Sequence, residues 1–149
     1  MKDKVKNCLD SIVIKLQWLE LKEFMSKRKI LVVDDDPQVY RIVSRLLNSE
    51  LYEIFSATQG REALEKIPQI KPDMLLLDLM MPEMSGVEVC EKIKKNPETQ
   101  NIVVFILSAK DGQIDRRRCF EAGADDYISK PFHIASLARK IEFTFEKKV

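Results

Sequence analysis

The sequence predicts an open, doubly wound α/β fold with a five-stranded parallel sheet, and three features support this prediction. Short apolar runs alternate with amphipathic segments five times after residue 29. The runs at the centre of this pattern are apolar on both faces, as parallel strands buried between two layers of helices must be. Turn and cap residues separate the segments. A strand followed by a crossover helix favours parallel pairing.

Five segments have the length and apolar content of strands. The runs at residues 31–33, 75–77 and 103–107 are apolar throughout, which indicates strands in the centre of the sheet. The other two segments are mixed in polarity, as is typical of the edges. The predicted strands span residues 30–33, 52–57, 74–79, 102–107 and 126–129.

Five further segments carry apolar residues at helical spacing. Asp36 and Pro37 form an N-cap followed by a proline in the first turn, and Gly123 stands where a glycine ends a helix. The pair Lys71 and Pro72 separates a helix from the third strand. The predicted helices span residues 38–48, 59–67, 86–95, 113–122 and 134–147.

Length and charge limit the possible functions. A chain of 149 residues has the size of one domain, so we expect no second catalytic domain and an output that passes through another protein. The net charge of +1 offers no bulk field for nucleic acid or an anionic membrane, so we expect direct binding to neither.

The cysteines and the N-terminus favour a cytoplasmic location. Cys8, Cys90 and Cys119 are widely spaced and odd in number, which fits buried or free thiols that serve as packing residues in a reducing compartment. The first apolar run is interrupted by Lys15 and is followed by no cleavage site of a signal peptide. No segment approaches the roughly 20 apolar residues of a membrane span.

Acidic residues follow two predicted strands at the edge of the sheet where ligands bind. In open parallel sheets this edge lies beyond the carboxyl ends of the central strands. Asp34, Asp35 and Asp36 follow the first strand, and Asp78 closes the third. Gathered carboxylates repel one another and lose hydration, so a cation would stabilise them. Oxygen ligands favour Mg²⁺, whereas zinc would favour Cys or His.

These residues also have simpler explanations, which differ in weight. Asp36 alone is best interpreted as a helix cap. Asp78 interrupts an apolar run, where an unpaired charge would be costly, so we favour a functional role. Ser108 and Lys130 end two strands and could each be a turn residue. Beside the carboxylates, however, they could bind a phosphoryl group on Asp78 through a hydroxyl and an ammonium group.

Four motifs, in this order and at this spacing, resemble those of the two-component response-regulator receiver family. The resemblance covers residues 29–149 and is more specific than any one motif. It implies a flavodoxin-like (βα)5 receiver domain preceded by an extension over residues 1–28. The motifs are VVDDD (32–36), LLLDLMMPEMSG (75–86), ILSAK (106–110) and DDYISKPF (125–132).

The resemblance implies a phosphorylation site that depends on Mg²⁺. Asp78 would be the phosphoacceptor, and Asp34 and Asp35 would be the acidic pair that serves Mg²⁺. The backbone carbonyl of Met80 would be a further metal ligand. Met80 and Lys110 also occupy positions that modulate the lifetime of the phosphoryl group in this family, and we expect slow or moderate autodephosphorylation because Met offers no polar group to a water.

The resemblance also implies which residues respond to phosphorylation. Lys130 would contact the phosphoryl group, Ser108 would be the switch hydroxyl, and Tyr127 would be the aromatic residue that rotates with it. The bond between Lys130 and Pro131 is expected to be cis.

The implied activity is that of a switch rather than of an enzyme with a separate substrate. A sensor histidine kinase or phosphotransfer protein would supply the phosphoryl group. Phosphorylation would reshape the face of residues 113–122, 126–129 and 134–147, to which an unknown target or a second copy would bind. This face contains the arginine run 116–118, for which a solvated helix face is the simpler interpretation.

Residues 1–28 are predicted to form a helix with two apolar stripes. We define the first stripe as Val5, Leu9, Ile12, Leu16 and Leu19, and the second stripe as Ile14, Trp18, Leu21 and Met25. The stripes lie on nearly opposite sides, so one buried face cannot cover both. The helix could pack on its own domain, or one stripe could meet a partner or a second copy, with Trp18 and Leu21 as anchors. The first stripe's spacing fails at Glu23 and Ser26, which argues against a long coiled coil.

Three alternatives compete with this interpretation. A phosphatase of the haloacid-dehalogenase type also uses a nucleophilic aspartate, but Gln38 stands where its Asp-x-Asp-x-Thr/Val motif ends. A degenerate receiver that acts only as an interaction module would not require Asp78, Ser108 and Lys130. A flavodoxin-like cofactor binder would need a hydroxyl-rich loop where this chain has aspartates.

Overall fold

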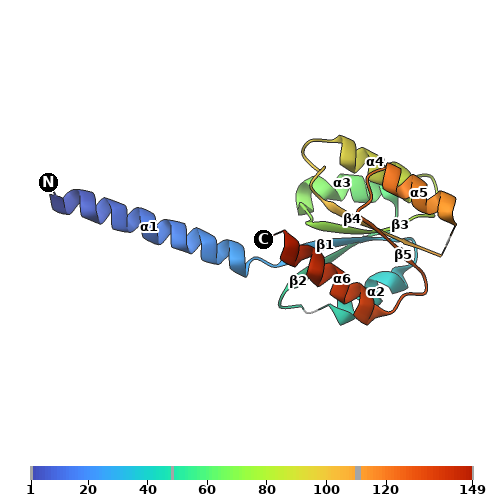
Figure 1. Ribbon diagram of the computed structural model, residues 1–149, viewed down its shortest axis with the longest axis horizontal. Helices are drawn as coiled ribbons and strands as arrows, with labels where there is room; N and C mark the ends of the chain where they lie inside the picture. The colour runs from blue at the N-terminus through green and yellow to red at the C-terminus, as the bar shows by residue number, and fades with distance from the viewer. Residues whose placement is uncertain (1, 48, 110–111, 149) are drawn as a thin grey trace.

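A five-stranded parallel sheet lies between two layers of helices in the computed structural model, which describes residues 2–47, 49–109 and 112–148 (Figure 1). The strand order is β2-β1-β3-β4-β5, and all four neighbouring pairs are parallel. This arrangement confirms the predicted doubly wound fold. The strands are β1 (Arg28–Val33), β2 (Tyr52–Ala57), β3 (Met74–Asp78), β4 (Val103–Ser108) and β5 (Asp126–Ser129).

The helices cover the sheet from both sides because each presents one apolar face. Three helices pack on one face and two on the other. Figure 1 shows the two helix layers on either side of the sheet. The first group is α3 (Gly60–Ile70), α4 (Gly86–Lys95) and α5 (Gln113–Glu121), and the second is α2 (Pro37–Leu46) and α6 (Ile134–Lys147). A further helix, α1 (Lys2–Met25), precedes the sheet.

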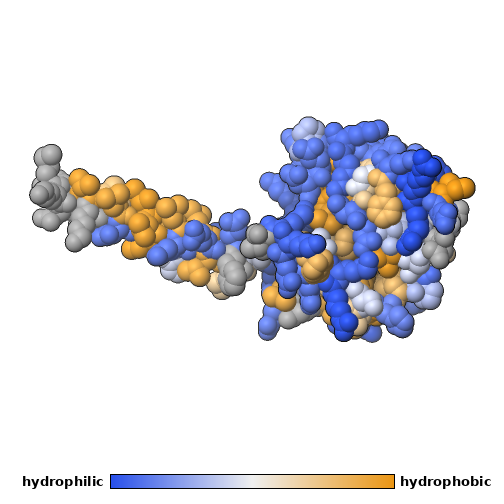
Figure 2. All heavy atoms as spheres, in the orientation of Figure 1, coloured by the Kyte–Doolittle hydropathy of each residue, from blue (hydrophilic) through white to orange (hydrophobic). Residues whose placement is uncertain are grey.

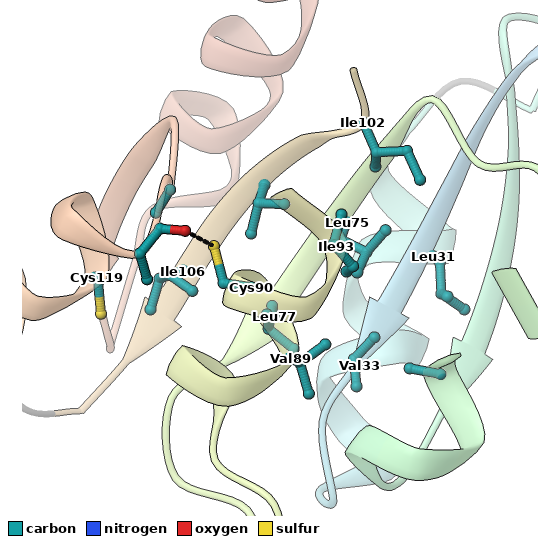
Figure 3. Packing of buried hydrophobic residues seen from close by; sticks show 14 of the residues in the cluster. Leu31, Val33, Leu75, Leu77, Val89, Cys90, Ile93, Ile102, Ile106 and Cys119 are labelled. Atoms are coloured by element: carbon teal, nitrogen blue, oxygen red, sulfur yellow. Dashed lines mark hydrogen bonds between the residues drawn. The ribbon is translucent and has the colours of Figure 1, made fainter. Parts of the chain in front are cut away.

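The core consists of two clusters that share the central strands. Successive side chains of a strand point to opposite faces, so Leu75 and Leu77 join the cluster under α3, α4 and α5, while Met74 and Leu76 join the other. All four are fully buried. Figure 3 shows the first cluster, with Cys90 of α4 packed over β3 and β4. Burying one such aliphatic side chain stabilises the fold by about 1.5–3 kcal/mol.

The edges of the sheet are the two strands of mixed polarity, as predicted. β2 and β5 each pair with one neighbour only. Both contain half-buried positions, whereas β3 and β4 are buried throughout. The composition of the strands therefore separates the two edge strands from the three central ones.

Several element boundaries differ from the prediction by one to three residues. β3 ends at Asp78 and β4 extends to Ser108. α3 continues through Pro68 to Ile70, although proline removes one helical hydrogen bond, because Ile70 still packs against the core and Lys71 ends the helix in a left-handed conformation. Asn48, the predicted end of a helix, lies outside the described residues.

Helix α1 projects away from the sheet and its helix layers (Figure 1). All of its described side chains are exposed, so the structure does not show the packing of this helix on its own domain that the sequence left open. None of the described helices combines the length and apolar content that a membrane span requires.

Candidate functional site

The end of β1 and the end of β3 bring three carboxylates together. These strands are neighbours, and Val33 pairs with Leu77, so Asp34 and Asp78 follow at the same level. Asp34 and Asp78 are 5% and 8% exposed, whereas Asp35 is exposed to solvent. One carboxylate oxygen of each of the three lies within 4.8 Å of the others. The structure thus brings together the three predicted acidic residues.

Asp36 belongs to a helix cap and not to this cluster. Its carboxylate accepts a hydrogen bond from the backbone N–H of Gln38 at 2.9 Å, in the first turn of α2. Its own N–H donates to Asp34 Oδ1 at 2.9 Å, which orients the Asp34 carboxylate. The interpretation of Asp36 as a cap is therefore confirmed.

Lys130 places a positive charge between two of the carboxylates. It follows β5, and its ammonium group lies 2.6 Å from Asp34 Oδ2 and 3.5 Å from Asp78 Oδ1. The lysine side chain is 22% exposed, so water screens these contacts only in part. Asp34 is thus the better partner of Lys130, while Asp78 is held only by the longer contact.

The electrostatics of the cluster leave Asp78 poorly neutralised. Burial raises the pKa of the Asp78 carboxyl, and the neighbouring Asp34 raises it further, while Lys130 offsets part of this rise. Burial alone would lower the pKa of Lys130, but its hydrogen bond to Asp34 and the charge of Asp78 outweigh burial and raise it. One ammonium group therefore faces three carboxyl groups, and a further cation would favour their ionised forms.

The donor set fits Mg²⁺. This ion prefers hard oxygen ligands such as carboxylates, and Asp34, Asp35 and Asp78 each offer one carboxylate oxygen within 4.8 Å of the others. These residues would hold the ion, which would supply positive charge next to Asp78. Met80 follows at the same strand end, and its backbone carbonyl remains a predicted ligand.

The loop after β3 passes directly over the backbone of Asp78, a feature that the sequence interpretation did not assign. The N–H of Gly86 donates to the carbonyl of Leu79 at 2.9 Å. A Cβ on Gly86 would lie 2.3 Å from the carbonyl oxygen of Asp78, so only glycine fits. Ser85 and Glu88 cap α4 reciprocally immediately beside this contact. Such a glycine is recognisable from sequence only through the motif that contains it.

Ser108 and Lys130 are joined through the backbone. Ser108 is fully buried at the end of β4, and its carbonyl accepts a hydrogen bond from the N–H of Lys130 at 2.7 Å. Asp78 pairs with Leu107, the residue before Ser108, so both side chains lie at the same edge of the sheet. The bond between Lys130 and Pro131 is cis, as predicted.

Tyr127 is buried, and an arginine of α5 covers its ring. The guanidinium carbon of Arg116 lies 5.0 Å from the ring centroid, and Arg116 also donates to the carbonyl of Tyr127 at 3.4 Å. Arg117 pairs instead with Glu121 at 2.8 Å. All three arginines of the run are exposed, as expected for a solvated helix face, and Arg116 also contacts the predicted switch residue.

Two features lie outside this group. Lys110, predicted to modulate the lifetime of a phosphoryl group, is not among the described residues. A hollow lined by Arg28, Asp73 and Phe145 opens elsewhere, away from the carboxylates, and contains none of the predicted site residues.

The comparisons with known proteins agree with this geometry. The model of the response regulator receiver domain family matches residues 30–142, and the chain belongs to this family. A putative response regulator from Chloroflexus aurantiacus is 32% identical, with a TM-score of 0.73 over 78% of this chain and 96% of that one. The BeF3-activated receiver domain of DrrB, a Thermotoga maritima protein, is 31% identical, with a TM-score of 0.74 over 81% and 99% of the two chains.

A longer curated protein is similar in sequence to this chain over more residues than the family match covers. A probable cyclic di-GMP phosphodiesterase of Vibrio cholerae is 37% identical over 141 residues, which cover 95% of this chain. The same residues cover 32% of that protein. This chain therefore spans about a third of that relative, and the matched part includes residues that precede the receiver family's match.

Proposed function

We propose that this receiver domain is a phosphorylation-dependent switch in which Asp78 accepts a phosphoryl group from a histidine kinase or a phosphotransfer protein. The observation that carries the proposal is the buried carboxylate cluster of Asp34, Asp35 and Asp78 with Lys130 beside it. A buried, poorly neutralised carboxylate next to a metal-binding geometry and an ammonium group has few purely structural explanations.

The residues divide the chemistry among them. A carboxylate oxygen of Asp78 would attack the phosphorus of a phosphohistidine, the P–N bond would break, and the imidazole would leave with a proton. Bound Mg²⁺ would screen the negative charge on the transferred group. Lys130 lies close enough to both carboxylates to contact a phosphoryl oxygen, and Asp34 and Asp35 would hold the ion.

The output face would be α5, β5 and α6. A phosphoryl group adds nearly two negative charges beside Ser108, which could draw this hydroxyl inward and change the packing of Tyr127 and of the Arg116 stacked on it. A downstream protein in the cytoplasm, or a second copy of the chain, would bind this face. Arg116→Ala would then alter target binding without altering phosphorylation.

Incubation with acetyl phosphate and Mg²⁺, followed by intact-mass measurement, tests the assignment. We expect one phosphoryl group on the wild type, none on Asp78→Asn, and strongly reduced labelling of Asp35→Ala because the ion loses a ligand. Asp36→Ala is the matched control, since it removes an adjacent aspartate that serves only as a cap. Equal labelling of the wild type and Asp78→Asn would refute the phosphoacceptor assignment. An unlabelled wild type would instead indicate a degenerate receiver.

A further inference from the structure

Helix α1 lacks the packing that normally stabilises a helix of its length. It has 24 residues, and its described large apolar side chains are between 48% and 77% exposed. Figure 2 shows these side chains as an apolar band along the helix, away from the rest of the molecule. Helices in proteins gain most of their stability by burying an apolar face. A helix with this much apolar surface in water would therefore be stabilised by binding a partner.

The first stripe is the longer of the two apolar surfaces. Its five aliphatic residues are separated by steps of four and three, the spacing of the core positions of a coiled coil. From sequence, Trp18 and Leu21 of the second stripe are the expected anchors, on the condition that the helix buries one of its stripes on its own domain. Because both stripes are exposed, this condition is not met. The second stripe also has only four residues and a polar residue, Ser11, at its next heptad position toward the N-terminus.

The charges beside the first stripe favour a second copy in parallel orientation. Lys15 and Lys22 flank the stripe on one side, and Glu20 flanks it on the other; the position that Lys22 would face, Lys27, lies beyond the end of α1. In a parallel pair, a residue at the position of Lys15 faces the residue five places further along the partner, which is Glu20. Each pair of helices would thus form two Lys–Glu contacts. In an antiparallel pair, the lysine sides of both helices would meet and repel.

We infer that α1 pairs in parallel with α1 of a second copy of this chain along the first stripe. The inference does not depend on the phosphorylation of Asp78. Burying five half-exposed aliphatic side chains removes on the order of 400 Å² from water on each copy. This is about half of the ~800 Å² per partner in a standard interface, so the dimer is weak and depends on concentration, with a Kd on the order of 10–100 µM.

Sedimentation of the full chain from about 10 to about 500 µM, in EDTA and reducing agent, tests the pairing. The reducing agent prevents a disulfide between the exposed Cys8 thiols from mimicking a dimer. We expect a monomer–dimer equilibrium. Leu16→Ala in the first stripe raises the Kd about tenfold or more, whereas Leu21→Ala in the second stripe changes it less than about twofold. Alanine preserves helix propensity, so both variants keep α1 helical.

Charge exchange tests the orientation. Lys15→Glu and Glu20→Lys each place like charges opposite one another in a parallel homodimer and raise the Kd by roughly tenfold. An equimolar mixture of the two variants regains wild-type affinity, because both contacts between positions 15 and 20 in the mixed dimer join opposite charges. The inference is overturned by a wild type that stays monomeric over the whole range, by a loss of association with Leu21→Ala but not Leu16→Ala, or by tighter association of Lys15→Glu.

Discussion

Replacing Asp78 by asparagine should stabilise the fold when Mg²⁺ is absent. The Asp78 carboxylate is 8% exposed and lies beside Asp34, while its contact with Lys130 is the longer one at 3.5 Å. Its raised pKa shows that the folded state disfavours the ionised form. Asparagine has nearly the same shape and removes the charge, so the variant loses the repulsion and keeps the packing.

The expected gain is about 1–2 kcal/mol in the free energy of unfolding near neutral pH. One buried carboxylate with incomplete pairing costs a few kcal/mol, and the weak Lys130 contact that is lost offsets part of the gain. The pH dependence has a defined sign. The pKa of Asp78 is higher in the folded state than in the unfolded state, so ionisation of Asp78 lowers the stability of the wild type at pH values above the folded-state pKa. Acid protonates Asp78 and removes this loss, so the stability advantage of asparagine disappears at low pH.

Urea unfolding in EDTA at pH 7.5 and at acidic pH measures this difference. Far-UV circular dichroism is the suitable probe, because the only tryptophan, Trp18, lies on the exposed helix α1. Asp34→Asn is the matched control, since it removes a carboxylate at the same site that has a short 2.6 Å contact with Lys130. We expect this control to be less stable than Asp78→Asn by about 1–3 kcal/mol.

Mg²⁺ should reduce or reverse the advantage of asparagine. At ten times its Kd the ion stabilises the wild type by about 1.4 kcal/mol, and it binds Asp78→Asn more weakly. If Asp78→Asn is no more stable than the wild type in EDTA, or if Asp34→Asn gains as much, the electrostatic reasoning about this cluster is wrong.

Three further predictions concern the surroundings of the site. Asp36→Ala removes the cap of α2 and should lower the free energy of unfolding by about 1 kcal/mol, in the same urea titration, while Mg²⁺ affinity stays unchanged. Gly86→Ala should strongly destabilise the β3–α4 loop or abolish phosphorylation by acetyl phosphate, because the Cβ of alanine would overlap the backbone of Asp78. Normal labelling and a normal melting temperature would contradict the observed close approach. A thiol reagent at pH 8 should modify only Cys8 in the native chain and all three cysteines after unfolding. Burial raises the pKa of Cys90 to about 11, and Cys119 is buried as well. Rapid modification of a second thiol would show that the core opens readily.

The local pattern of apolar and polar residues was sufficient to predict most of the secondary structure and which two strands form the edges of the sheet. A run such as 75–77 is apolar at every position, and all of these side chains are buried between the helix layers. The predicted acidic residues meet because parallel strands bring their carboxyl ends to one edge. Pro68 shows the limit of local rules, since the burial of Ile70 carries α3 past the proline.

The residues of the candidate site could be predicted from sequence alone, because charged and polar side chains that follow apolar parallel strands lie together at one edge of the sheet. The sequence could not determine how they are paired. Lys130 contacts Asp34 more closely than Asp78, and Lys130 and Asp34 lie 96 residues apart in the chain. Arg116 stacks on Tyr127, and Gly86 admits the loop over Asp78. Such contacts depend on the distances between packed elements, which are set by how the helices and strands pack in the folded chain.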